Sequence, residues 1–169
     1  MILKKQQIAW SLFLVLTSTV LFTSCTDHPT TTSSNSKKQV SNNMKSVLII
    51  GMNPLTMDFT NPEIPQGLSA QIIEKGLNET IEKLITMGYD AQIFLIDNGD
   101  TNLDKLAQQL SKANYDGVVI GNGIRGLKSN FILFEQLINV VHVSAPKSTI
   151  IFNSLPTDTD EAVKRWIMP

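Results

Sequence analysis

The feature that most constrains the fold is a fourfold alternation between short apolar runs and longer segments with helical spacing. The apolar runs, rich in β-branched residues, are residues 47–50, 91–97, 117–121 and 148–153. The segments with helical spacing are residues 69–87, 103–112, 130–143 and 158–166. Such alternation predicts right-handed βαβ units and a parallel sheet that helices cover on both faces. We expect an α/β fold with four strands in the order 2-1-3-4, flavodoxin-like or receiver-like but shortened by one strand.

Local signals mark the ends of two of these helices. Gly88 directly follows the first helical segment, at the place where a helix often closes with a glycine. Asp158 and Glu161 have the spacing of a capping box at the start of the last helix. This spacing predicts Asp158 as the N-cap and Glu161 as the residue that reaches back to it.

The first 25 residues have the three parts of a bacterial export signal. Lys4 and Lys5 precede an apolar run over residues 8–22, which is short for a span of about 20 apolar residues and is interrupted by Ser and Thr. The run ends in LFTSC, which resembles the lipobox of bacterial lipoproteins, although Phe22 stands where leucine is usual. We expect residues 1–24 to be a lipoprotein signal peptide and Cys25 to carry the acyl chains, palmitate among them. An ordinary signal peptide or a membrane anchor with an incidental cysteine is the alternative.

Composition divides the rest of the chain into a linker and one domain. Residues 25–45 are rich in Ser, Thr and Asn and nearly free of apolar side chains, so we expect a flexible tether in which His28 is solvated. Residues 46–169 are long enough for one α/β domain with its own core. This segment has nine basic and fourteen acidic residues, a net charge of −5 with neutral histidines. A mildly acidic domain is a poor candidate for binding nucleic acid.

The glycines of YDGVVIGNGIRG spell a dinucleotide-binding fingerprint in the wrong place. Gly121, Gly123 and Gly126 follow the third apolar run, whereas the fingerprint follows the first strand and needs an acidic residue about 20 positions later. Residues 144–147 offer no carboxylate, and the next helix is expected to begin only near Asn130. We therefore interpret the first two glycines as turn residues at a strand end and expect no dinucleotide cofactor.

The chain also lacks the residues on which the chemistry of two related folds depends. Receiver domains need an aspartate after the third strand and acidic residues after the first, but this chain has Gly121, Asn122, Met52 and Asn53 there. Flavodoxins bind a flavin phosphate in a Ser/Thr-rich loop after the first strand, where this chain offers only two threonines among prolines. We expect neither a metal site nor a cofactor. Cys25 is the only cysteine, so its lipidation would also exclude cysteine chemistry.

Ligands of parallel sheets bind outside the carboxyl ends of the strands. The loops at that edge bring together several polar residues and one cation, and we expect them to contact a small anionic or polar ligand: Asn53, Asn122, Gly123, Arg125 and Asn153. The guanidinium of Arg125 would fork onto a carboxylate or a phosphate. A surface arginine paired with a neighbouring aspartate is the alternative.

Catalytic candidates are few. The connection over residues 52–68 is long and contains three prolines, so it could fold over the site as a lid with Asp58 as an acid/base group. A solvated aspartate or a turn cap is the other interpretation of Asp58. Glu135 would lie close enough to touch the site or to hold Arg125. His142 would lie about 18 Å along the same helix, so we expect it to have a structural or surface role.

Six stretches together resemble a family of small, uncharacterised α/β proteins, flavodoxin-like or Rossmann-like, that occur in bacteria and fungi. They are VLIIGMNPLTMDF, GLSAQIIEKGL, FLIDNGD, YDGVVIGNGIR, LFEQLINVVH and IFNSLPTDTDEAVKRW, and they cover residues 44–166. The resemblance implies a fold and no activity. Members of the family often begin near the position of Met44, so translation from Met44, which would give a cytosolic form, is an alternative to export.

The sequence thus predicts a lipoprotein of the bacterial cell envelope, anchored to a membrane and facing the periplasm or the cell surface. Its domain is expected to bind a small anionic or polar ligand at the strand carboxyl edge. Whether it is an enzyme stays open. A hydrolase or transferase would use Asp58 or Glu135, with Arg125 as electrostatic stabiliser, and a scaffold would dock a partner protein through its acidic surface or the helix over residues 130–143.

Overall fold

The computed structural model describes residues 44–99 and 103–169. The predicted signal peptide, Cys25, His28 and nearly all of the predicted tether lie outside the described residues.

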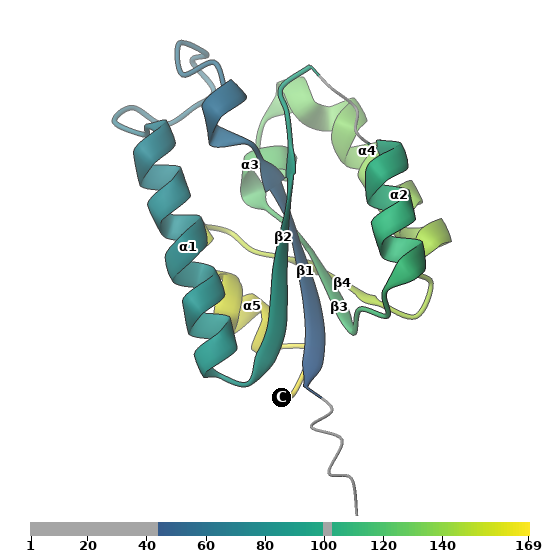
Figure 1. Cartoon of the computed structure of the whole chain (residues 1–169). Coiled ribbons are helices and arrows are strands. Elements are labelled where there is room, and N and C mark those ends of the chain that lie inside the picture. The colour runs from purple at the N-terminus through teal and green to yellow at the C-terminus, as the bar shows by residue number, and fades with distance from the viewer. Residues whose placement is uncertain (1–43, 100–102) are drawn as a thin grey trace, which may run out of the picture. The chain divides into compact units, whose positions relative to one another are not determined.

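The sheet has the predicted topology. Its four strands are β1 (Lys45–Met52), β2 (Tyr89–Ile96), β3 (Gly117–Ile120) and β4 (Thr149–Phe152). All pairings are parallel and the strand order is β2-β1-β3-β4, so β1 and β3 are central (Figure 1). The register sets Ile49 beside Ile93 on one side and beside Val119 on the other. The α/β fold expected from the alternation of apolar runs and helical segments is therefore confirmed.

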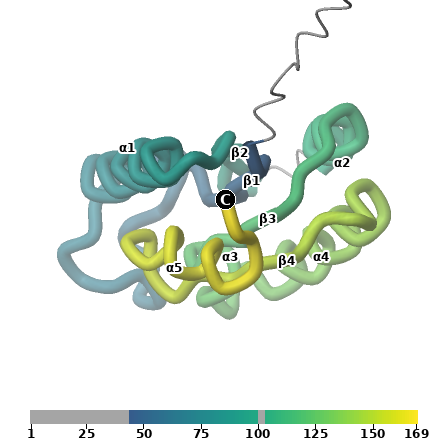
Figure 2. Tube along the Cα trace, turned by 90° about the horizontal axis from the view of Figure 1, so that it is seen from below, coloured from purple at the N-terminus to yellow at the C-terminus, as the bar shows by residue number. Residues whose placement is uncertain are grey.

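The helices cover both faces of this sheet. They are α1 (Ala70–Thr86), α2 (Leu103–Lys112), α3 (Asn122–Arg125), α4 (Phe131–Ser144) and α5 (Thr159–Lys164). Helices α1 and α5 lie on one side of the strands and α2 and α4 on the other (Figure 2). Within residues 44–99 and 103–169, no helix combines the length and the apolar character that a membrane crossing requires.

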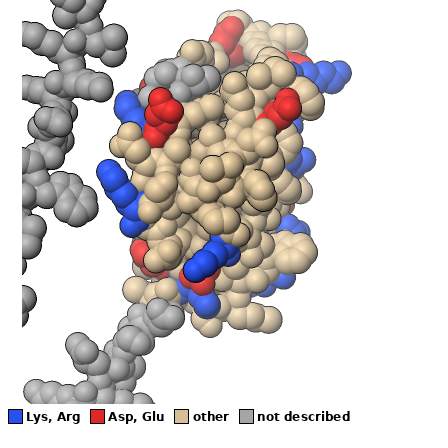
Figure 3. Space-filling view, turned by 90° about the vertical axis from the view of Figure 1, so that its right-hand side faces the viewer, with Lys and Arg blue, Asp and Glu red and all other residues tan. Residues whose placement is uncertain are grey.

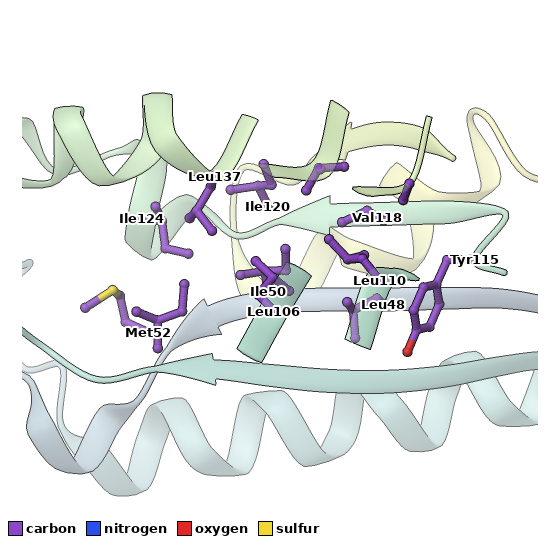
Figure 4. Close-up of a cluster of buried hydrophobic side chains, with 13 residues drawn as sticks. Leu48, Ile50, Met52, Leu106, Leu110, Tyr115, Val118, Ile120, Ile124 and Leu137 are labelled. Carbon is purple, nitrogen blue, oxygen red and sulfur yellow. The ribbon is translucent and has the colours of Figure 1, made fainter. Parts of the chain in front are cut away.

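The core consists of two clusters, one on each face of the sheet. Alternate residues of β1 supply both, because successive side chains of a strand point to opposite faces. Leu48, Ile50 and Met52 pack against α2 and α4 (Figure 4), whereas Val47 and Ile49 pack against α1 and α5. Full burial of one such side chain contributes about 1.5–3 kcal/mol. All members of both clusters lie within residues 47–167, so residues 44–169 contain a complete core.

The helix ends agree only in part with the sequence signals. Gly88 follows α1 with a φ of 92°, the left-handed conformation predicted for it. Asp158 is the N-cap of α5, as predicted, but its side chain makes no capping bond to that helix. Its carboxylate instead accepts hydrogen bonds from the backbone N–H groups of Ser154 and Leu155. The reason is a short 3-10 turn, Pro156–Asp158, whose preceding N–H groups compete for the same carboxylate.

The segment after β3 also differs from the expectation of a plain turn. The chain enters the short helix α3 at once and then passes through a 3-10 turn, Lys128–Asn130, into α4. Gly121 has an ordinary φ of −66°, so left-handed backbone does not explain it. A Cβ atom at this position would lie 3.1 Å from the carbonyl oxygen of Ile50, so the close approach of two backbones favours glycine here.

A test of the packing uses Gly117, where a Cβ atom would lie 2.9 Å from Cδ1 of Ile151 and 3.2 Å from Cγ1 of Ile167. We expect Gly117→Ala to destabilise residues 44–169 by about 1–3 kcal/mol, because both side chains are buried and must shift. Urea unfolding measures the loss. Gly123→Ala is the matched control, since nothing lies within 4 Å of a Cβ there, and it should leave the stability unchanged or raise it. Equal stability of the two variants would contradict this packing.

Candidate functional site

The carboxyl edge of the sheet divides into two hydrogen-bonded groups, and the first surrounds Asn53. The Nδ2 atom of Asn53 donates to Oδ1 of Asp97 at 2.6 Å, and its Oδ1 atom accepts from the N–H of Leu55 at 3.1 Å. The latter bond caps a 3-10 turn, Pro54–Thr56. Both polar atoms of this side chain are therefore engaged within the fold, between the ends of β1 and β2.

The second group surrounds Asn153, the residue that follows β4. Its side chain is buried, with 5% exposed. Its Oδ1 atom accepts from the backbone N–H of Asn122 at 2.9 Å, and its Nδ2 atom donates to Oγ1 of Thr159 at 2.8 Å. One amide thus joins the end of β4 to the first residues of α3 and of α5. Both polar atoms of the Asn153 side chain, which was predicted to contact a ligand, are therefore engaged within the fold.

Arg125 extends this second group to the surface. Its Nη2 atom donates to Oδ1 of Asn122 at 3.1 Å and to the carbonyl oxygen of Asn153 at 2.9 Å. The guanidinium carbon lies 5.8 Å from the centroid of the Phe152 ring, within the range of a cation–π contact. We call Asn122, Arg125, Phe152 and Asn153 the Arg125 site. The Phe152 ring is itself held in place by an edge-to-face contact with Phe134 of α4, with the two ring centroids 5.8 Å apart.

Within the part of the chain that the structure describes, the charge of Arg125 has no partner of opposite sign. Across residues 44–99 and 103–169, every ion pair involves a lysine, and none includes Arg125. The predicted contact between Glu135 and Arg125 is therefore wrong: Glu135 lies exposed on α4, and Arg125 is held by Asn122 and Asn153. No aspartate among the described residues pairs with Arg125, and Asp100 lies outside them.

The other predicted site residues lie apart from this charge or are engaged elsewhere. Gly123 is exposed, and its carbonyl oxygen accepts from Nδ2 of Asn130 at 3.2 Å. Asp58 accepts hydrogen bonds from Oγ1 of Thr60 at 2.6 Å and from its N–H at 2.9 Å, and these bonds lower the pKa of Asp58. This is the geometry of a turn cap, the second of the two interpretations of Asp58. His142 is exposed in the last turn of α4, consistent with the expected surface role.

The long connection between β1 and α1 is held down by a residue that sequence reasoning missed. Oε2 of Glu63 accepts hydrogen bonds from the N–H of Ser129 at 3.1 Å and from its Oγ at 2.9 Å. Ile64 is buried beside it. These contacts join the loop after β1 to the loop after β3, and β1 and β3 are the two central strands of the sheet. We call the bonds between Glu63 and Ser129 the Glu63 latch. No local signal identifies the pair, because 66 positions separate Glu63 from Ser129.

Two shallow hollows lie on the described part of the chain, and Arg125 lines neither of them. The smaller, of about 300 Å³, lies between α1 and the edge strand β2 and includes Asn53 and Glu74 in its lining. The larger, of about 970 Å³, lies at the opposite, amino edge of the sheet. Residues 44–99 and 103–169 contain no cluster of three His, Cys, Asp or Glu side chains suited to a metal ion. The Arg125 site is thus an open surface site.

Comparison with known proteins gives no matching family model and no curated protein of significant sequence similarity. The resemblance to small α/β proteins of bacteria and fungi stays a prediction.

The Glu63 latch gives a prediction about loop motion and pH. The bonds from Ser129, the backbone bond first, lower the pKa of Glu63 from its ordinary value of 4.5. A lowered pKa means that the latch is present above pH 4.5 and is lost as the pH falls through the lower folded-state value. We expect Glu63→Ala to raise amide hydrogen exchange over residues 57–66 severalfold at pH 7, and acid to do the same in the unaltered chain.

Ser129→Ala is the matched control, because it removes the Oγ donor and keeps the N–H donor. Its effect on exchange should be smaller than that of Glu63→Ala. Equal exchange in the unaltered chain and in Glu63→Ala would contradict the latch.

Proposed function

We propose that this chain is a lipoprotein of the bacterial cell envelope whose α/β domain binds a small anionic ligand at the carboxyl edge of its sheet, with Arg125 as the principal contact. One observation carries the ligand-binding part. The guanidinium is fixed by two hydrogen bonds and an aromatic ring, yet no carboxylate neutralises it within the described residues. Two bonds to one nitrogen leave the other N–H donors for a carboxylate or phosphate, which guanidinium binds in a two-pronged manner.

The proposal changes the roles of the asparagines. Asn122 and Asn153 orient Arg125, while Asn53 belongs to the separate Asp97 group. Because the site is open and solvent screens its charge, we expect weak binding of a simple anion, with a dissociation constant on the order of 1 mM, about −4 kcal/mol. A larger ligand that also contacts neighbouring side chains would bind more tightly.

A hydrolase or transferase has less support. Such an enzyme needs a carboxylate close to the electrostatic stabiliser, but Asp58 is bonded to Thr60, and Glu135 forms no hydrogen bond or ion pair with Arg125. Whether the domain has any catalytic activity stays open.

A protein-docking role is the second candidate, and α4 favours it. Three large apolar side chains of this helix are exposed, namely Phe131, Ile132 and Val143. Figure 3 shows the side of the domain on which α2 and α4 lie, and most of its centre carries no charged side chain. Exposed apolar surface of this kind often marks a site of protein association.

Membrane anchoring rests on the sequence signal alone. Cys25 lies outside the described residues, and the first strand begins at Lys45, close to the predicted end of the tether. Acylation of Cys25 would place the domain at a membrane surface, facing the periplasm or the cell exterior, because two or more acyl chains anchor a protein stably.

The ligand proposal predicts that anions stabilise the domain through Arg125. Thermal unfolding of residues 44–169 is followed with inorganic phosphate, a nucleoside monophosphate and a dicarboxylate, each matched in ionic strength by sodium chloride. A ligand at twentyfold its dissociation constant should stabilise the fold by about 1.8 kcal/mol, a midpoint shift of several degrees. Arg125→Ala should abolish the shift, and Arg125→Lys should retain part of it.

Arg165→Ala is the matched control. Arg165 is also exposed, also lacks an ion pair among the described residues, and also donates to a backbone carbonyl at the end of β4, that of Phe152 at 3.0 Å. It should leave the ligand shift intact. A shift that survives in Arg125→Ala would contradict the Arg125 site, and no shift with any compound would favour the docking role of α4.

The anchoring proposal predicts that Cys25→Ser abolishes incorporation of labelled palmitate in bacterial cells and moves the protein from the membrane fraction to the soluble one. Thr23→Ala, a change two residues away that keeps a small side chain, is the control and should leave both readouts unchanged. Met44→Leu tests the alternative start. Loss of a short cytosolic form in this variant, with no labelled long form in the unaltered chain, would contradict export.

A further inference from the structure

The larger of the two hollows described above lies where the chain enters the domain. We call it the amino-edge hollow, and the start of β1, the end of α2, the turn between α4 and β4, and residues 166–168 line it. Figure 1 shows the C-terminus beside the start of β1 at the lower end of the domain. The predicted tether from Cys25 therefore joins the domain at this hollow, through Met44.

Three large apolar side chains on the rim of this hollow are exposed. Met44 is 53% exposed, Trp166 64% and Met168 78%. The backbone that carries the last two is fixed, because Ile167 between them is buried and its carbonyl oxygen accepts from the Tyr89 hydroxyl at 2.7 Å. A tryptophan held in water in this way is unfavourable, whereas in the headgroup region of a bilayer both its ring and its N–H find suitable surroundings.

The same end of the domain carries several lysines, some of them paired with carboxylates: Lys83 and Lys164 both pair with Asp160, and Asp90 lies at the start of β2. The helices run antiparallel to the strands, so their last turns lie at this edge and bring Lys83, Lys112, His142 and Lys164 toward it. Lys147 lies on the rim itself. The carboxylate on the rim, Asp116, is paired with Lys45 at 2.9 Å. Lys112 and Lys147 form no ion pair within the described residues, so both are available to anionic groups.

The length of the tether favours the presentation of this end to the membrane. Residues 26–43 separate Cys25 from Met44, and a random coil of that length spans roughly 23 Å. A domain of this size has a radius of gyration of about 14 Å. Its diameter is at least twice that value and therefore exceeds the average end-to-end distance of the tether. The end that carries the tether would therefore meet the bilayer more often than the opposite end.

We propose that the amino edge of the sheet is a membrane-docking surface, in which Trp166 and Met168 enter the headgroup region of an anionic bilayer and Lys112 and Lys147 lie against lipid phosphates. The proposal rests on the lipid anchor proposed above. It gives the two ends of the sheet separate roles, because docking by the amino edge leaves Arg125 at the carboxyl edge directed away from the membrane and open to ligands.

The fluorescence of Trp166 provides an intrinsic probe for a test of the docking surface. The segment from Cys25 onward holds one cysteine, Cys25, and one tryptophan, Trp166. Residues 25–169 are coupled through Cys25 to a maleimide lipid in phosphatidylcholine vesicles, with and without phosphatidylglycerol, and the emission of Trp166 is recorded. Docking predicts a blue shift, and quenching by lipids brominated near the headgroups, on the anionic vesicles. Lys147→Gln should weaken binding of uncoupled residues 44–169 to these vesicles about fivefold.

A matched control places the tryptophan elsewhere. The double variant Trp166→Phe, Phe131→Trp carries its only tryptophan at the start of α4, where Phe131 is exposed to the same extent, 64%. Its emission should be unchanged by the vesicles, because that end of α4 lies toward the carboxyl edge.

Two outcomes would overturn the proposal. One is Trp166 emission that is the same on anionic vesicles as on neutral ones. The other is a blue shift in residues 25–169 without vesicles that is absent from residues 44–169, which would show that the tether itself covers the hollow. Coupling is carried out in vitro, so either outcome leaves the lipidation of Cys25 in cells to be decided by the palmitate experiment. Failure of that experiment likewise leaves the docking result standing.

Discussion

The side-chain amide of Asn153 is the contact on which the arrangement of the carboxyl edge depends. It accepts from the first residue of α3 and donates to the first residue of α5, while its backbone carbonyl holds Arg125. Because the amide is buried, each group left without a partner would cost about 1–3 kcal/mol, more than an ordinary hydrogen bond contributes. Two helices, α3 after β3 and α5 after β4, are therefore positioned by one residue, and the orientation of the arginine follows from it.

The parallel sheet also explains why the two proposed surfaces lie at opposite ends. All strands share one direction, so loops that follow strands gather at one edge and loops that precede them gather at the other. Arg125 belongs to the first set, whereas Trp166 and Lys147 border the hollow at the second. An anchor that joins the chain near Lys45 would then restrain one edge and leave the other exposed to solvent.

Sequence reasoning predicted the fold because its signals are local. The alternation of apolar runs and helical spacing located all four strands and the four longer helical segments, and the chirality of βαβ units limited the strand orders. The short helix α3 was missed, since a single turn of four residues carries no periodicity. Asp158 was assigned the wrong bonds, because its carboxylate accepts from the N–H groups of Ser154 and Leu155, which precede the 3-10 turn and which a capping-box pattern does not include.

The site was predicted only in outline. Asn122, Arg125 and Asn153 come together as expected, because they follow the adjacent strands β3 and β4. Asn53 does not join them, since Asp97 at the end of β2 binds its amide. Contacts of this kind, like that of Glu63 with Ser129, depend on side-chain directions across loops that are distant in sequence. Residue spacing contains no information about them.

Anion binding at Arg125 is tested most directly by a nuclear magnetic resonance titration of nitrogen-labelled residues 44–169 with inorganic phosphate at constant ionic strength. We expect saturable shifts of the Arg125 side-chain N–H signal and of backbone amides in α3 and just after β4, with little change elsewhere. Shifts that are linear in phosphate and spread over the exposed lysines, with the Arg125 signal unmoved, would show that the arginine is a structural surface residue.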